Sequence, residues 1–502
     1  MTPASGTGKV AGKKSTGTVT AEKQSAGAFS LPLLPAEVWW LIFEHHSDDA
    51  WTLASIARVS RSFRATSTPI LIRHVVWKSP DHANQNLSWF WDLFPEMGRH
   101  VRSLVVDFDP PRLDEDVVFD LHEDLFDEIH IFASGLTRLS VIGTSLPPTF
   151  FAALEGLPNL RQLTVRQCPV PKPPERLTTP GLDTLSLSCL VPYTWDAYSP
   201  YFAHLFPTID TVLMDGATLP QPGVCAPRRL RLAPCVYRGS PKNILDVLHH
   251  FGLSALEELV IAHGESWGIR APPPVGGALP NLTTRLRSIV VPVNTMAALL
   301  SDPANELLSV ETVGLCGPIR RMDLEHSGRN ALVVIQSLVD RTPRLRCFSI
   351  TMGDWYEDLI LQIAEHLPRL EALEILYDLP SRPPKDFLQR LHSSHLPKLP
   401  LLKKLHLHLH PSLTGLYPDA FFGPASLHTP ERFSVIDTLT RAAPSLERVR
   451  LGADAHLSET WVRPDAATPW VAVKEAAEEI EWSSGFVVLD ELKPAYSLSV
   501  YR

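Results

Sequence analysis

The sequence predicts an α/β protein, with a small helical module followed by an irregular repeat solenoid whose strands form a parallel sheet on its concave side. Three observations support this. An apolar helical pattern occurs near the N-terminus, a leucine-rich phrase recurs through the rest of the chain, and 46 prolines punctuate that phrase. We expect a disordered tail over 1–28, the module over 29–78, the solenoid over 79–455 and a capping segment over 456–502.

Composition narrows the class of protein. The 44% hydrophobic and 20% charged content is typical of a folded chain. A net charge of −9 does not favour a nucleic-acid binder, and no apolar run reaches the roughly 18–20 residues of a membrane helix. The first 28 residues lack the apolar core of a secretory signal, and none of the six cysteines forms a C-x-x-C pair. We therefore predict a cytoplasmic or nuclear protein with reduced thiols, and neither nucleic acid nor membrane as a partner.

The helical module is formed by residues 34–43, L-P-A-E-V-W-W-L-I-F, and 54–64, A-S-I-A-R-V-S-R-S-F-R. In a helix from Pro35 to His46, Val38, Leu41 and Ile42 share one face. Proline suits the first turn, and Asp48 or Asp49 suits the cap of the next helix. About 45 residues bury little core, so the apolar surplus predicts a partner or a covering domain.

These segments resemble the F-box, the three-helix module that docks onto the Skp-type adaptor of an SCF-type cullin ubiquitin ligase. The family pattern is L-P-x-E-[VIL]-x-x-x-I-[FL], followed by A-x-V-[CS]-[RK]-x-[WF]-[RK], and this chain matches most marked positions. The resemblance implies that these residues bind the adaptor: Leu34, Pro35, Glu37, Val38, Ile42, Phe43, Leu53 and Val59. An ordinary helical cap on the solenoid is the alternative.

The repeated phrase behind the module is P-x-L-x-x-L-x-L, with clear copies starting at Pro158, Pro343, Pro368, Pro400 and Pro444. Its end alternates apolar and polar residues, which is typical of a half-buried strand. A helical stripe precedes several copies, as Leu359, Ile363 and Leu367 do before Pro368. Because proline cannot continue a helix, each unit is predicted to be a helix, a proline stop and a short strand.

This phrase resembles a degenerate leucine-rich repeat. Equivalent strand positions lie 22 to 32 residues apart, and one unit matches the family pattern fully through Leu160, Leu163, Val165 and Cys168. The asparagine slot is otherwise lost, so we expect an irregular solenoid. An N-terminal F-box followed by such repeats is a layout of fungal-type F-box proteins. Two ordinary α/β domains are the alternative.

The resemblance implies that residues between the buried leucines line the concave face and bind a client protein. Those singled out are Arg166, Thr351, Glu374, His406, His408 and Arg450. Strand alternation places His406 and His408 on one side, where imidazoles could hold a metal ion with outside help. No carboxylate or cysteine pattern completes such a site, so we predict no metal and no cofactor.

No catalytic motif is present: there is no G-x-S-x-G, no H-E-x-x-H and no dinucleotide-binding glycine loop. We therefore expect a non-enzyme. The predicted function is the substrate-recognition subunit of an SCF-type ligase, in which the F-box binds the adaptor and the repeats bind an unknown client. The alternative is a protein-interaction scaffold outside any ligase, using both parts structurally.

Overall fold

A computed structural model describes residues 34–47, 49–90, 95–108, 119–120, 128–166, 168, 181–188, 209–215, 225–233, 248–261, 285–305, 307–319, 329–352, 356–377, 387–409, 429–452, 459–465 and 468–473. The chain divides into two compact units, Met1–Leu71 (unit 1) and Ile72–Arg502 (unit 2). The predicted tail over 1–28 lies outside the described residues, as does most of the predicted capping segment.

Unit 1 contains three helices: α1 (Ala36–Glu44), α2 (Ala50–Val59) and α3 (Arg61–Leu71). Pro35 starts α1, and its carbonyl accepts the Val38 backbone N–H at 3.0 Å. Ser60 is extended between α2 and α3, and its hydroxyl accepts the Phe63 N–H at 3.0 Å. The core has three buried apolar side chains, with aromatic rings packed against them. The Trp39 and Phe63 rings lie 4.7 Å apart.

Unit 2 contains one sheet of sixteen strands in the described part, and the strands follow chain order apart from a separate pair, β3 and β5. Every neighbouring pair from β1 to β16 is parallel. This confirms the predicted α/β class and the long parallel sheet. The strands of the large sheet up to β16 are β1 (His74–Trp77), β2 (Ser103–Asp107), β4 (Arg138–Ile142), β6 (Gln162–Arg166), β7 (Thr184–Ser188), β8 (Thr211–Asp215), β9 (Arg229–Ala233), β10 (Glu258–Ile261), β11 (Ser288–Pro292), β12 (Thr312–Ile319), β13 (Cys347–Met352), β14 (Ala372–Tyr377), β15 (Lys404–Leu409) and β16 (Arg448–Gly452), and the separate pair is β3 (Phe119–Asp120) and β5 (Thr144–Ser145).

The two ends of the sheet differ from its middle. β1, which the predicted boundaries place in the helical module, pairs with β2 of unit 2. At the other end, β17 (Glu459–Val462) and β18 (Val471–Val473) pair antiparallel with β16 and with each other. Both strands fall in the segment predicted to cap the solenoid.

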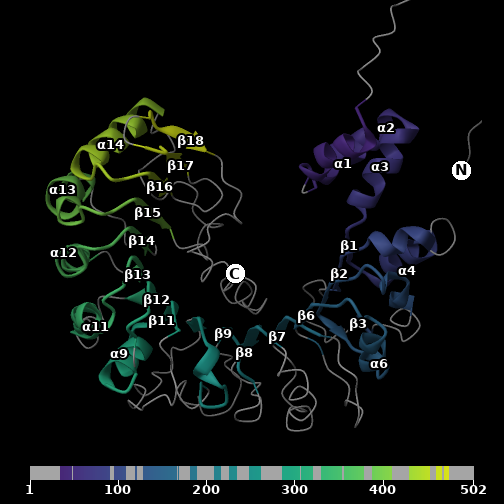
Figure 1. The fold of residues 1–502 in the computed structure, drawn as a ribbon, viewed down its shortest axis with the longest axis horizontal. Helices are drawn as coiled ribbons and strands as arrows, with labels where there is room; N and C mark the ends of the chain where they lie inside the picture. The colour runs from purple at the N-terminus through teal and green to yellow at the C-terminus, as the bar shows by residue number, and fades with distance from the viewer. Residues whose placement is uncertain are drawn as a thin grey trace, which may run out of the picture. The chain divides into compact units, whose positions relative to one another are not determined.

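The helices α9, α11, α12, α13 and α14 lie on one side of the strands (Figure 1). α11 ends just before Pro343 and α12 just before Pro368, as the proline stops predict. The helical elements of unit 2 are α4 (Pro80–Ser88), η2 (Pro95–His100), η3 (Glu128–Phe132), α6 (Phe150–Glu155), η5 (Leu253–Ala255), α9 (Val293–Ser301), α11 (Arg329–Arg341), α12 (Glu357–His366), α13 (Phe387–Arg390), η7 (Leu391–His395), η8 (Leu396–Lys398) and α14 (Thr429–Ala442).

The strand alternation separates the two faces of the sheet. In β14, Leu373 and Ile375 join one continuous core with the helices, whereas Glu374 lies on the opposite face, here called the second face. Two buried thiols also join different repeats. The Sγ of Cys168 donates to the carbonyl of Val141 at 3.4 Å, and the Sγ of Cys316 to that of Ile261 at 3.0 Å. The leucine-rich pattern thus builds a solenoid of one strand per repeat.

The residue directly before each strand forms a second regular row, along the edge where the strands begin. Along the parallel sheet, the backbone N–H of each donates to the carbonyl of the one before it, at 2.7 to 3.0 Å. Nine consecutive positions alternate in charge, and we call this row the charge ladder: Asp210, Arg228, Glu257, Arg287, Glu311, Arg346, Glu371, Lys403 and Glu447.

Candidate functional site

The first candidate site is an apolar stripe on α1. Leu34, Val38, Leu41 and Ile42 recur at helical spacing and are all exposed, Leu41 by 67%. Phe43 points the other way, into the core of unit 1. The main apolar stripe of this helix therefore faces away from the core of its own unit. Such a surface is typical of a contact with another molecule.

α2 extends the apolar exposure of unit 1. Trp51 and Val59 are 78% and 70% exposed. Asp49 fixes the start of this helix, because its carboxylate accepts the backbone N–H of Thr52 at 2.9 Å and the hydroxyl at 2.6 Å. These hydrogen bonds from Thr52 lower the pKa of Asp49. Because Asp49 caps the helix, Trp51 lies in its first turn, where its side chain is exposed. We call Leu34, Val38, Leu41, Ile42, Trp51 and Val59 the exposed apolar set.

The structure divides the eight residues predicted to bind an adaptor. Leu34, Val38, Ile42 and Val59 belong to the exposed apolar set, and Pro35 and Glu37 are exposed beside them. Phe43 and Leu53 lie in the core of unit 1, at 1% and 0% exposed, and so support this surface from beneath. The sequence argument did not single out Trp51 for this surface. The sequence feature that could have identified Trp51 is its position two residues after a capping aspartate, in the first turn of a helix.

The second candidate site is a polar row across the second face of unit 2. Strand register aligns Ser349, Glu374, His406, Arg450 and Thr460 on five neighbouring strands. Each is at most 4% exposed. The Ser349 hydroxyl donates to Oε2 of Glu374 at 2.7 Å. Three of the residues predicted to bind a client are thus brought side by side, and all three are buried.

The other predicted client-binding residues lie elsewhere on the sheet. Thr351 shares β13 with Ser349 and is 1% exposed. Arg166 ends β6, far along the strand order from this row, and His408 lies in β15. The side chains of Arg166 and His408 are outside what the structure describes. Period-two alternation placed these residues on the second face, but it carries no information on burial there.

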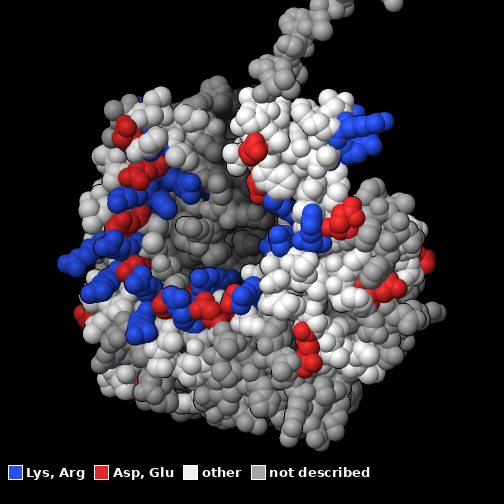
Figure 2. Space-filling model, turned by 45° about the vertical axis from the view of Figure 1, so that its right-hand side comes forward, with Lys and Arg blue, Asp and Glu red and all other residues white. Residues whose placement is uncertain are grey.

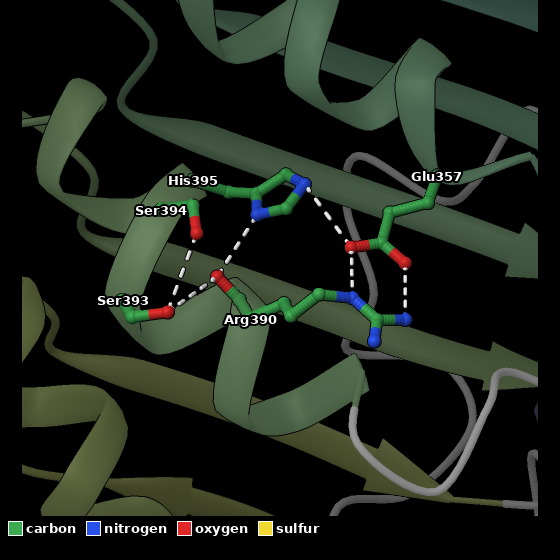
Figure 3. Close-up of polar contacts among 5 residues, drawn as sticks. All are labelled: Glu357, Arg390, Ser393, Ser394 and His395. Carbon is green, nitrogen blue, oxygen red and sulfur yellow. Dashed lines mark hydrogen bonds and ion pairs between the residues drawn. The ribbon is translucent and has the colours of Figure 1, made fainter.

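A third polar cluster joins the helices of unit 2. The Arg390 guanidinium donates two hydrogen bonds of 2.6 Å to the Glu357 carboxylate, linking the end of α13 to the start of α12. Nδ1 of the buried His395 lies 3.0 Å from the Arg390 carbonyl, whereas Nε2 lies 3.8 Å from Glu357 Oε1, beyond hydrogen-bond distance. Figure 3 shows the Ser393 hydroxyl between the Arg390 carbonyl and the Ser394 hydroxyl, and neither hydroxyl is joined to the imidazole. This cluster braces the helices and offers no activated nucleophile.

Within the described ranges, no group of three or more His, Cys, Asp or Glu side chains is placed to hold a metal ion. None of the helices that the structure describes is both long and apolar enough to span a bilayer.

Comparisons with known proteins give structural similarities only. No protein-family model matches the chain, and no curated protein matches it. Among solved structures, the yeast Rad7–Elc1 complex is similar at a TM-score of 0.32 and 16% identity, covering 82% of this chain and 87% of the other. The leucine-rich-repeat ectodomain of the Arabidopsis thaliana receptor kinase GASSHO1/SCHENGEN3, solved with CASPARIAN STRIP INTEGRITY FACTOR 2, gives a TM-score of 0.22 and 12% identity. That match covers 63% of this chain, which spans 43% of the ectodomain.

Proposed function

We propose that the chain is the substrate-recognition subunit of an SCF-type cullin ubiquitin ligase. Unit 1 acts as the F-box that docks a Skp-type adaptor, and unit 2 binds a client protein. The observation that carries the proposal is the exposed apolar set, since four of its six members occupy positions that the F-box resemblance assigns to the adaptor contact. The remaining two, Leu41 and Trp51, enlarge the same kind of surface.

The size of unit 1 supports a docking role. Its fully buried apolar core consists of Phe43, Leu53 and Ile70, with aromatic rings only partly covered around it. A module this small gains little stability from such a core. Burying the exposed apolar set against a partner would remove a large apolar surface from water and stabilise the unit. Docking and folding of unit 1 are therefore expected to reinforce each other.

In this role the chain brings the client close to the catalytic subunits and makes or breaks no covalent bond itself. Holding client lysines near a ubiquitin-loaded enzyme raises their effective concentration. The absence of catalytic motifs from the sequence supports assigning catalysis to other subunits. A solenoid of neighbouring strands supplies the extended surface that client binding needs.

The test is co-purification of the full chain with a Skp-type adaptor and a cullin. Pro35→Ala combined with Ile42→Asp is expected to abolish recovery of both partners, because Ile42 is exposed and the aspartate disturbs the contact without entering the core. Leu308→Asp is the matched control, since Leu308 is a similarly exposed leucine in unit 2. It should leave recovery unchanged.

Two outcomes count against the proposal. Undiminished recovery of the adaptor by the double variant would contradict docking through the exposed apolar set. Recovery of the adaptor without cullin would instead support an interaction scaffold that uses the same module outside a ligase.

A further inference from the structure

Two adjoining cavities open beside the charge ladder, where β11, β12, β13 and β14 begin. The first, of 280 Å³, is lined by Glu257, Arg285, Arg287, Ser309, Glu311 and Arg344. The second, of 430 Å³, is lined by Glu311, Pro343, Arg344, Leu345, Arg346, Arg369, Glu371 and Leu401. They share Glu311 and Arg344. Arg344 therefore lies between two recesses on one edge of unit 2.

The charges of this lining do not cancel. Glu257 is paired with Arg228 at 2.9 Å. Glu371 is paired with Lys403 at 3.0 Å and with Arg346 at 3.4 Å. Two of the three lining glutamates are thus neutralised by ladder cations, leaving positive charge in excess around the cavities.

Four of the arginines that line the cavities form no ion pair in the described part of the chain. In the described part of the chain, no ion pair or side-chain hydrogen bond engages Arg285, Arg287, Arg344 or Arg369, and all four are exposed. Figure 2 shows basic and acidic side chains interleaved along one face of unit 2. Free guanidinium groups beside a recess are suited to bidentate binding of a phosphate.

We propose that this edge binds a phosphorylated serine or threonine segment of a partner protein. Arg344 with Arg285 and Arg287, or with Arg369, receives the phosphate, and the second cavity receives an apolar neighbour. Its lining supports this, because Leu401 is 51% exposed beside Pro343 and Leu345. A phosphoserine carries nearly two negative charges and three acceptor oxygens, which matches arginines that approach from both sides.

The lining favours a peptide over a nucleic acid. Among the described residues, no aromatic side chain lines either cavity, so unstacked bases would find no platform there. The three glutamates would also repel the successive phosphates of a nucleic-acid backbone, whereas an isolated phosphate can avoid them.

This inference goes beyond the proposed ligase role and uses neither the exposed apolar set nor the second face. It can therefore fail while adaptor docking holds, and the reverse is also true. Its readout is peptide binding by the purified full chain, without adaptor or cullin.

The test uses a labelled peptide library with a fixed phosphoserine and degenerate flanks, compared with the same library carrying serine. We expect clear retention of the phosphorylated library only. Arg344→Ala should weaken it by about tenfold or more, since a charge-assisted bidentate contact is lost. Arg344→Lys keeps the charge without the fork and should be intermediate. Arg229→Ala is the matched control, because Arg229 is an exposed arginine of the same edge outside both cavities.

Four results would overturn the proposal: equal retention of both libraries, unchanged retention by Arg344→Ala, tighter binding of single-stranded RNA, or inorganic phosphate binding as tightly as the library. Thermal melting of each variant checks folding, which exposed arginines are not expected to affect.

Discussion

Units 1 and 2 place their apolar side chains in opposite ways. In unit 2, the leucines of each strand and the stripes of each helix meet in one core that continues from repeat to repeat. In unit 1, α1 turns only Phe43 fully inward and leaves its main stripe exposed. The comparison teaches that repetition completes a core within one chain, whereas a three-helix module leaves part of its apolar surface for another molecule.

The largest expected effect separates the two units directly. Leu53→Ala removes a fully buried side chain from a core of three, at a cost of about 2–5 kcal/mol. That cost is comparable to the whole stability of so small a unit. Unit 1 should unfold while unit 2 stays folded. Hydrogen exchange followed by residue would show protection lost over α1 to α3 and kept in the strands.

Val59→Ala is the control for that change, because Val59 is 70% exposed in the same helix as Leu53. It should leave hydrogen exchange unchanged. Loss of protection in both units with Leu53→Ala would show that they fold as one body.

The next effect concerns the buried polar row of unit 2. Ser349→Ala removes the hydroxyl that donates to the Glu374 carboxylate, and Glu374 is 0% exposed. A buried polar group that loses a hydrogen-bond partner costs about 1–3 kcal/mol. Chemical denaturation should show this loss in the transition of unit 2, with that of unit 1 unaffected. Equal stability of the variant would mean that the hydroxyl is replaced by another donor.

Burial of a thiol gives unit 2 an alkaline sensitivity. Burial raises the pKa of Cys225 to about 12. Below about pH 9 the thiol is protonated in both the folded and the unfolded chain. Its contribution to the free energy of unfolding is then fully present and does not change with pH. As the pH rises from about 9 towards 12, only the unfolded chain loses the proton, and stability falls by up to about 1.4 kcal/mol per pH unit.

The measurement is the difference between the wild-type chain and Cys225→Ala in denaturation at pH 8 and pH 10. The variant should lose less stability over that interval. Parallel curves for the two proteins would contradict a thiol that stays protonated in the fold.

The smallest expected effect lies in the charge ladder. Arg228→Gln removes the guanidinium that contacts Glu257 and Asp210. Exposed ion pairs contribute little and are screened by salt, so the melting temperature should fall slightly at low salt and not at about 1 M salt. Arg229→Gln, which breaks no ion pair in the described ranges, serves as control. A loss that persists in high salt would assign Arg228 a packing role instead.

The sequence predicted the parts of the fold that depend on local pattern. The stripe of Leu359, Ile363 and Leu367 predicted a helix before Pro368, and Leu373 and Ile375 predicted the strand after it; both are confirmed. The burial of Glu374 could not be predicted in this way. Period-two alternation assigns a side chain to a face of the sheet but does not say what covers that face.

The candidate sites show the same limit. The apolar stripe of α1 was found from spacing, but helical periodicity does not say whether a stripe meets its own core or a partner, and Phe43 occupies the inward side. The charge ladder was missed, although its residues directly precede the strand phrases. Because the repeats are unequal in length, these positions align only when the strand register is known.

The alternation of the charge ladder imposes a parity on the length of the solenoid. Removing the single repeat that carries Arg346 would bring Glu311 beside Glu371, and like charges on neighbouring strands repel. Removing that repeat together with the next would bring Glu311 beside Lys403 and keep opposite charges adjacent. Over this stretch, repeats can be lost or duplicated in pairs without electrostatic conflict, but not singly.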